Sequence, residues 1–133
     1  MTSKVIYKGN LRTECEHLKS GNTFITDAPT DNNGKGQAFS PTDTVATALA
    51  SCMLTVMGIK AKDLDTDLTG TEAHVTKHMA SDPRRISKIE VVLYFKISPD
   101  DKIKTILERS ANTCPVLYSL HPDIVKDIKF NWL

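Results

Sequence analysis

Apolar and polar residues alternate along the first part of the chain. Between residues 5 and 17 the apolar side chains fall mostly on odd positions: Val5, Tyr7, Leu11 and Cys15. A period of two predicts one half-buried strand over residues 5–17. Residues 19–22 have the composition of a turn, and residues 23–26 then predict the returning strand of a hairpin.

A long helix is predicted after a loop. The loop is residues 27–38, where Gly, Pro, Asn and Asp cluster. Ser40-Pro41-Thr42-Asp43 then combines an N-cap Ser, a Pro at the first helical position and an acid in the first turn, so a helix begins there and continues to about Lys62. Apolar residues on nearly every side predict a central helix enclosed by other structure. Its apolar stretch, Val45–Ile59, has fifteen residues, fewer than the roughly 20 that span a bilayer, which favours a core helix.

The second half of the chain is predicted to form two strands, two helices and a last strand. Two strands are predicted over residues 70–79 and 86–97, followed by an amphipathic helix that starts near Asp100 and ends near Ser110. A short helical turn after Cys114 and a last strand at 128–132 complete the order β-β-α-β-β-α-α-β. The fold class predicted is therefore α+β, in a single domain over residues 1–133.

Charge and cysteine usage exclude several classes of function. Seventeen basic and sixteen acidic residues give a net charge of +1, so no strong field attracts nucleic acid or an anionic membrane. The chain starts without the pattern of a secretory signal, which predicts a cytoplasmic protein. Three cysteines at wide spacing are unlike a structural disulfide framework and predict mostly reduced thiols.

The cysteines are the candidate reactive groups. Cys52 lies in the central helix among apolar residues, where it is either a small core residue or a redox nucleophile that a cation activates. Cys114 precedes Pro115 at a predicted helix start, where unpaired backbone N–H groups favour a thiolate; the alternative is a residue that only fills the cap position. Cys15, on the apolar face of its strand, is predicted to be core.

Neither a metal nor a phosphate-bearing cofactor is expected. His74 and His78 alternate in a predicted strand, where about 13 Å separates them, too far for one ion to bridge. Gly34-Lys35-Gly36 lacks the rest of a phosphate-binding loop and does not lead directly into a helix.

Two cysteine motifs resemble those of a known family. The run from Phe39 to Met53 begins a Pro-initiated, Ala-rich helix and contains Ser51-Cys52, and Cys114-Pro115-Val116 follows 62 residues after Cys52. This pattern, with strand pairs before and after the helix, resembles the OsmC/Ohr family of peroxide-detoxifying proteins over nearly the whole chain. Asp27-Ala28-Pro29 and Asp82-Pro83-Arg84-Arg85 resemble an OsmC-like branch of it.

The resemblance implies roles for particular residues. Cys52 corresponds to the peroxidatic cysteine, Cys114 to the resolving cysteine, and Arg12 to the arginine that stabilises the thiolate and binds the peroxide. In the family a Glu early in the central helix holds that arginine. Thr42 and Asp43 occupy those places here, and Asp43 has a side chain one methylene shorter. The family also implies an intertwined homodimer, with the helix enclosed by antiparallel sheets and the sites at the subunit interface.

The implied function is a thiol-dependent peroxidase in oxidative stress defence. Cys52 reduces an organic hydroperoxide to an alcohol, Cys114 condenses the resulting sulfenic acid to a disulfide, and a dithiol restores both thiols. The family's reductants are lipoyl-bearing proteins. The alternative is a non-catalytic dimeric α+β protein that binds a small hydrophobic ligand, with Cys52 in the core. Reaction of Cys52 with thiol reagents at neutral pH supports the enzyme, whereas reaction only after unfolding supports the binding protein.

Overall fold

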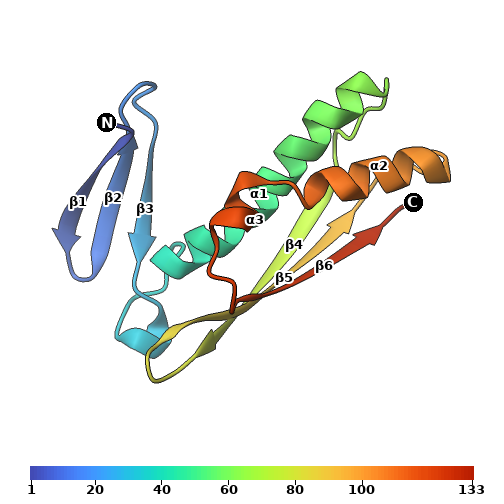
Figure 1. Ribbon diagram of the computed structural model, residues 1–133. Helices are drawn as coiled ribbons and strands as arrows, with labels where there is room; N and C mark the ends of the chain where they lie inside the picture. The colour runs from blue at the N-terminus through green and yellow to red at the C-terminus, as the bar shows by residue number, and fades with distance from the viewer. The chain divides into compact units, whose positions relative to one another are not determined.

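The computed structural model describes residues 1–133, which divide into two units, Met1–Val45 and Ala46–Leu133. Figure 1 labels the strands β1 to β3 of the first unit, and the strands β4 to β6 and helices α2 and α3 of the second. Helix α1 begins in the first unit and continues into the second. The single domain over the whole chain stays a prediction.

An antiparallel sheet in the order β1-β2-β3 forms the first unit. Its strands are β1 (Ser3–Gly9), β2 (Arg12–His17) and β3 (Thr23–Asp27). The prediction of one strand over residues 5–17 is wrong, because a turn at Asn10 and Leu11 separates β1 from β2. Val5 pairs with Cys15 across this turn. Both positions are odd, so the alternation continues through the turn and conceals it.

The predicted start of the central helix is confirmed. Helix α1 spans Pro41–Asp63. The Ser40 hydroxyl accepts a hydrogen bond from the Asp43 N–H at 3.1 Å, and the Asp43 carboxylate accepts one from the Ser40 N–H at 2.9 Å. This is a capping box, in which each residue satisfies a backbone donor that the helix leaves unpaired. The preceding loop contains one short 3-10 helix, η1 (Thr30–Asn32).

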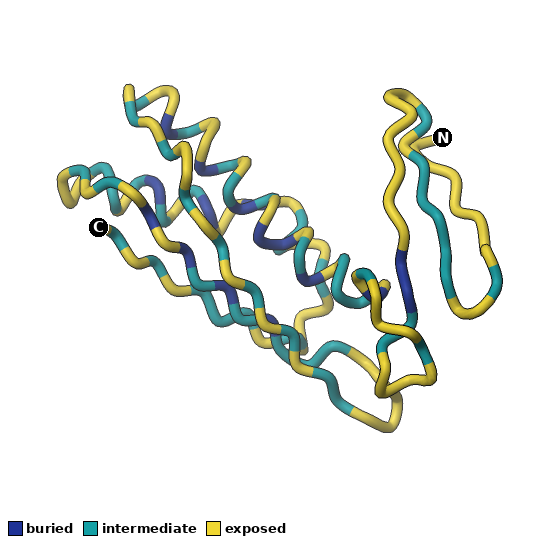
Figure 2. Tube along the Cα trace, turned by 180° about the vertical axis from the view of Figure 1, so that it is seen from behind, coloured by how far each residue is buried: buried dark blue, intermediate teal, exposed yellow.

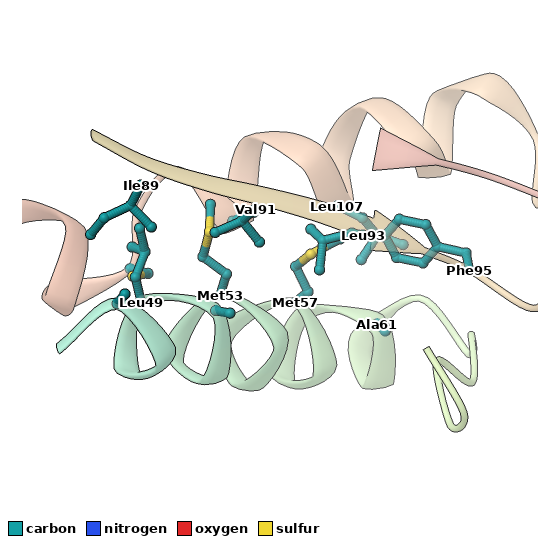
Figure 3. Close-up of a cluster of buried hydrophobic side chains, with 13 residues drawn as sticks. Leu49, Met53, Met57, Ala61, Ile89, Val91, Leu93, Phe95 and Leu107 are labelled. Atoms are coloured by element: carbon teal, nitrogen blue, oxygen red, sulfur yellow. The ribbon is translucent and has the colours of Figure 1, made fainter. Parts of the chain in front are cut away.

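The second unit packs helices on a three-stranded sheet. The sheet order is β4-β5-β6, from β4 (Glu72–Ala80), β5 (Arg85–Tyr94) and β6 (Val125–Asn131). Helices α2 (Asp101–Ala111) and α3 (Pro115–Ser119) lie between β5 and β6 in the chain. Figure 3 shows the core of this unit, in which side chains of α1 point toward those of β5. The fully buried residues of the two elements are Leu49, Met53, Met57, Ile89, Val91 and Leu93.

One part of the predicted topology needs correction. Strands β4 and β5 are antiparallel as expected, but β6 pairs with β5 in parallel. The expectation of antiparallel sheets is therefore wrong for this pair. The reason is the connection: α2 and α3 return the chain along the sheet, so the strand that follows enters in the same direction as β5. With this change and the extra strand β2, the α+β architecture is confirmed.

Helix α1 buries one side within the described chain. Figure 2 shows its buried residues at helical spacing, and they are Ala46, Leu49, Ala50, Met53, Met57 and Ala61. Ile59, on another side, is 66% exposed. By length and composition α1 is also apolar enough to cross a membrane, a test that core helices of soluble proteins pass as well. The packing on β5 identifies it as a core helix of this fold.

Candidate active site

Cys52 lies at the edge of the core of the second unit. It follows the buried pair Leu49 and Ala50 on α1 and precedes buried Met53, and it is itself partly buried and packed against the core. A rigid helix therefore holds this thiol where one side meets apolar side chains. The structure thus places Cys52 neither in the closed core nor on the open surface.

Cys114 is the N-cap residue of α3, as its position before Pro115 predicts. Its sulfur accepts a hydrogen bond from the backbone N–H of Leu117 at 3.3 Å. The residue is fully buried, with no exposed surface. Cys114 therefore both caps a helix and keeps its thiol away from solvent.

The fold brings Cys52 and Cys114 together. Cys52 packs against the buried cluster that contains Cys114, and it raises the pKa of the Cys114 thiol, although 62 positions separate the two residues in the chain. Both residues belong to the unit Ala46–Leu133. Both cysteines are free thiols, Cys52 half-buried and Cys114 fully buried, so the fold places two reduced sulfurs in one region of the second unit.

The Cys114 thiol differs from the expectation in its ionisation. Burial raises its pKa most strongly, the Leu117 N–H opposes this increase, and the neighbouring Cys52 raises the pKa further. The free-energy cost of removing a thiolate from water is larger here than the stabilisation that the backbone N–H groups at the helix start provide. Burial therefore favours the neutral thiol at Cys114.

Arg12 is bound to a carboxylate in the first unit. Its Nε donates to Oδ1 of Asp27 at 2.7 Å and its Nη2 donates to Oδ2 at 2.8 Å, while Nη2 also donates to Oε1 of Gln37 at 3.1 Å. The hydrogen bond from Arg12 is the main cause that lowers the pKa of Asp27, with burial opposing it. Asp27 is 1% exposed, whereas the Arg12 side chain is 31% exposed.

The sequence pattern does not single out Asp27 as a site residue. The composition of residues 27–38 predicts a loop, but Asp27 is the last residue of β3 and lies opposite Arg12 in the strand register. The pairing follows from the hairpin between β2 and β3, which becomes visible only when β2 is recognised as a separate strand. Asp43, the expected anchor of Arg12, takes part in the capping box of α1.

The other candidates lie elsewhere. Cys15 is a partly buried free thiol on β2, in the unit that does not contain the cysteine pair. His74 and His78 lie in β4 with exposed side chains, and they contact Glu72 and Glu90 respectively. No group of three or more His, Cys, Asp or Glu side chains gathers in a way that could hold a metal ion.

Comparisons with known proteins bear on the family and the fold of the chain. The family model described as OsmC-like protein matches residues 34–129. A crystal structure from Psychrobacter arcticus 273-4, whose name refers to an osmotic stress induced and detoxification response, is 55% identical, with a TM-score of 0.95 over 98% of this chain and 95% of that chain. No curated protein matches the chain.

More distant structures share the fold alone. An organic hydroperoxide resistance protein OsmC from Legionella pneumophila is 12% identical, with a TM-score of 0.76 over 97% of this chain and 94% of that one. The organic hydroperoxide resistance protein OhrB of Bacillus subtilis is 16% identical, with a TM-score of 0.71 over 98% of both chains.

Proposed function

This chain belongs to the OsmC-like family, and from that premise we propose that it is a thiol-dependent peroxidase that reduces organic hydroperoxides to alcohols. The observation that carries the proposal is the packing of Cys52 against the buried cluster that contains Cys114. A half-buried thiol beside a fully buried one, at the edge of an apolar core, suits a two-cysteine redox cycle.

The first step takes place at Cys52. Its thiolate attacks the outer oxygen of the hydroperoxide, the O–O bond breaks, and the leaving alkoxide takes up a proton to become the alcohol. Sulfur is oxidised to a sulfenic acid while the peroxide is reduced. Apolar residues next to Cys52 favour organic hydroperoxides over hydrogen peroxide, because they accommodate the hydrocarbon part of the substrate.

The second step uses Cys114. Its sulfur attacks the sulfenic sulfur of Cys52, a disulfide forms, and water leaves with the Cys114 proton and the sulfenic hydroxyl. A dithiol then reduces the disulfide, and we propose a lipoyl-bearing protein as its source. The Cys114 thiol, whose pKa burial raises, stays protonated until Cys52 is oxidised, which avoids two adjacent thiolates.

Arg12 is proposed to stabilise the Cys52 thiolate and to bind the peroxide. A cation near a thiolate favours the charged form. The guanidinium keeps N–H groups available, because the bonds to Asp27 and Gln37 use Nε and Nη2. Asp43 stays a predicted member of the site, with its observed bonds to Ser40 at the start of α1.

A cytoplasmic homodimer is the proposed assembly. On one face of the β1–β3 sheet, large apolar side chains are exposed: Val5 at 60%, Tyr7 at 65% and Phe24 at 53%. Such a face is costly to leave in water, and a second copy of the chain would cover it. The intertwined arrangement and the sites between subunits belong to this proposal.

Peroxide consumption tests the proposed activity. The purified protein is given an organic hydroperoxide and several dithiols in turn, including dihydrolipoamide. We expect turnover in the wild type and in Cys15→Ser, and none in Cys52→Ser, since Ser is close in shape to Cys but cannot cycle. Turnover in Cys52→Ser, or alkylation of Cys52 only after unfolding, contradicts the proposal and favours a ligand-binding protein.

A further inference from the structure

We propose that Asp27, at the end of β3, is the residue that positions Arg12 for the reaction at Cys52. The inference rests on the proposed peroxidase function and extends it, because it assigns the anchoring role to a strand residue rather than to the central helix.

The contact between the two side chains fixes the guanidinium in orientation as well as in place. Two parallel bonds, of 2.7 and 2.8 Å, join Nε and Nη2 of Arg12 to both carboxylate oxygens of Asp27. A bidentate pair of this kind sets the plane of the guanidinium, which a single bond or a lysine could not do. The Nη1 atom, with two N–H groups, is left to donate to an anion.

Asp27 is itself held by the segment that leads into α1. Its Oδ2 accepts a hydrogen bond from the backbone N–H of Gln37 at 3.2 Å, and its own N–H donates to the carbonyl of Phe39 at 3.0 Å. The Gln37 side chain also accepts from Arg12. Carboxylate, backbone and neighbouring amide therefore form one connected network, with Asp27 at its centre.

The backbone on the Arg12 side is equally constrained. Leu11, immediately before Arg12, has φ of 63°, a left-handed conformation that is unfavourable for a residue other than glycine. Its N–H donates to the Tyr7 hydroxyl at 3.3 Å, and its carbonyl accepts from the N–H of Ala28 at 3.0 Å. The turn before Arg12 is thus bonded to the residue after Asp27.

Exposure distinguishes the two members of the pair. Asp27 is 1% exposed, but the Arg12 side chain is 31% exposed and lines a surface pocket whose charged residues also include Lys8, Lys35 and Glu14. A buried carboxylate behind an accessible guanidinium leaves the cation free to meet a ligand from one side. This arrangement favours a positioning role over a purely structural ion pair.

The test compares Asp27→Asn, Asp27→Glu, Arg12→Ala and the double variant Arg12→Ala/Asp27→Asn in the full chain. Asp67→Asn is the matched control, because Asp67 is an exposed carboxylate that only bonds within its own turn, at Thr69. Two quantities are measured at Cys52 by peptide mass spectrometry: the rate of oxidation by a hydroperoxide and the rate of alkylation against pH.

We expect Asp27→Asn and Arg12→Ala each to slow the oxidation of Cys52 by about tenfold or more, with the alkylation profile displaced to higher pH. Asp27→Glu, which restores the charge, should fall between Asp27→Asn and the wild type. If Asp27 acts through Arg12, adding Asp27→Asn to Arg12→Ala changes the rate by less than about twofold.

Several outcomes would overturn the inference. One is an alkylation profile in Asp27→Asn that is unchanged or displaced to lower pH, which means that Asp27 only offsets the charge of Arg12. Another is an additive loss in the double variant. Circular dichroism checks the fold of each variant, and Asp27→Glu carries the test if Asp27→Asn does not fold. If Cys52 in the Asp27 variants is oxidised and alkylated at wild-type rates, this inference alone is contradicted. If Cys52 of the wild type does not react with hydroperoxide, the proposed function is contradicted.

Discussion

The backbone N–H of Leu117 donates a hydrogen bond to the sulfur of Cys114 at 3.3 Å. The sulfur atom therefore caps α3, and it belongs to the thiol whose pKa burial and the neighbouring Cys52 raise. Because a hydroxyl oxygen can accept the same bond, a serine at this position retains the cap while removing the redox chemistry. An alanine removes both, so the two substitutions separate the two roles of Cys114.

Cys114→Ser is expected to leave the sulfenic acid on Cys52 unresolved. After one equivalent of organic hydroperoxide the sulfenic acid should persist and react with dimedone, and excess peroxide should convert it to the sulfinic acid. Mass spectrometry of the Cys52 peptide detects both species. Cys114→Ala should show the same chemistry, and its free energy of unfolding should be about 1 kcal/mol lower because the cap is lost. Full catalytic turnover in Cys114→Ser would show that another group resolves the sulfenic acid.

The wild-type protein should form one disulfide under the same treatment. We expect one equivalent of organic hydroperoxide to join Cys52 to Cys114 within a subunit, because both lie in the same unit and Cys52 packs against the buried cluster that contains Cys114. A disulfide requires Cα atoms within about 7 Å, or a local movement that brings them there. Non-reducing peptide mapping identifies the bond. Cys15 should stay a free thiol, and its appearance in the disulfide would contradict the assignment.

Local signals in the sequence predicted the helix starts well. The capping box at Ser40 and Asp43 and the cap at Cys114 depend on residues within four positions of one another, so the sequence pattern carries them directly. The strand alternation was less informative. A two-residue turn at Asn10 and Leu11 preserves the parity of the apolar positions, and the pattern alone could not distinguish one long strand from a hairpin.

The features that were missed depend on pairing between distant segments. Strand β6 lies parallel to β5 because of the helices between them, which the composition of residues 128–132 does not reveal. The partner of Arg12 likewise follows from the register of β2 with β3. The family resemblance indicated Cys52 and Cys114 as the reactive pair, which stays a prediction, and it indicated Asp43 where the structure bonds Asp27 to Arg12.

The packing of α1 predicts a large difference between core and surface substitutions. Met53 has no exposed surface and points toward β5 (Figure 3), so Met53→Ala should lower the free energy of unfolding by about 2 to 5 kcal/mol. Val125 on β6 is 56% exposed, and Val125→Ala should change it by less than about 1 kcal/mol. Urea denaturation measures both. Similar losses in the two variants would contradict the core described here.

The ion pair of Arg12 and Asp27 should make the free energy of unfolding depend on pH in the acidic range. Arg12 lowers the pKa of Asp27 in the folded chain, so the folded state holds the proton of this carboxylate less tightly than the unfolded state does. The stabilisation is therefore complete above the ordinary pKa of an aspartate, about 4, and is lost as the pH falls through the lower folded value. The free energies of unfolding of the wild type and Asp27→Asn, measured by urea denaturation, should thus differ most at neutral pH and converge below about pH 4.

In an Arg12→Ala background most of this convergence should disappear, because the main cause of the pKa shift of Asp27 is gone. A difference between wild type and Asp27→Asn that stays constant down to pH 3 would show that Asp27 does not form this ion pair in solution.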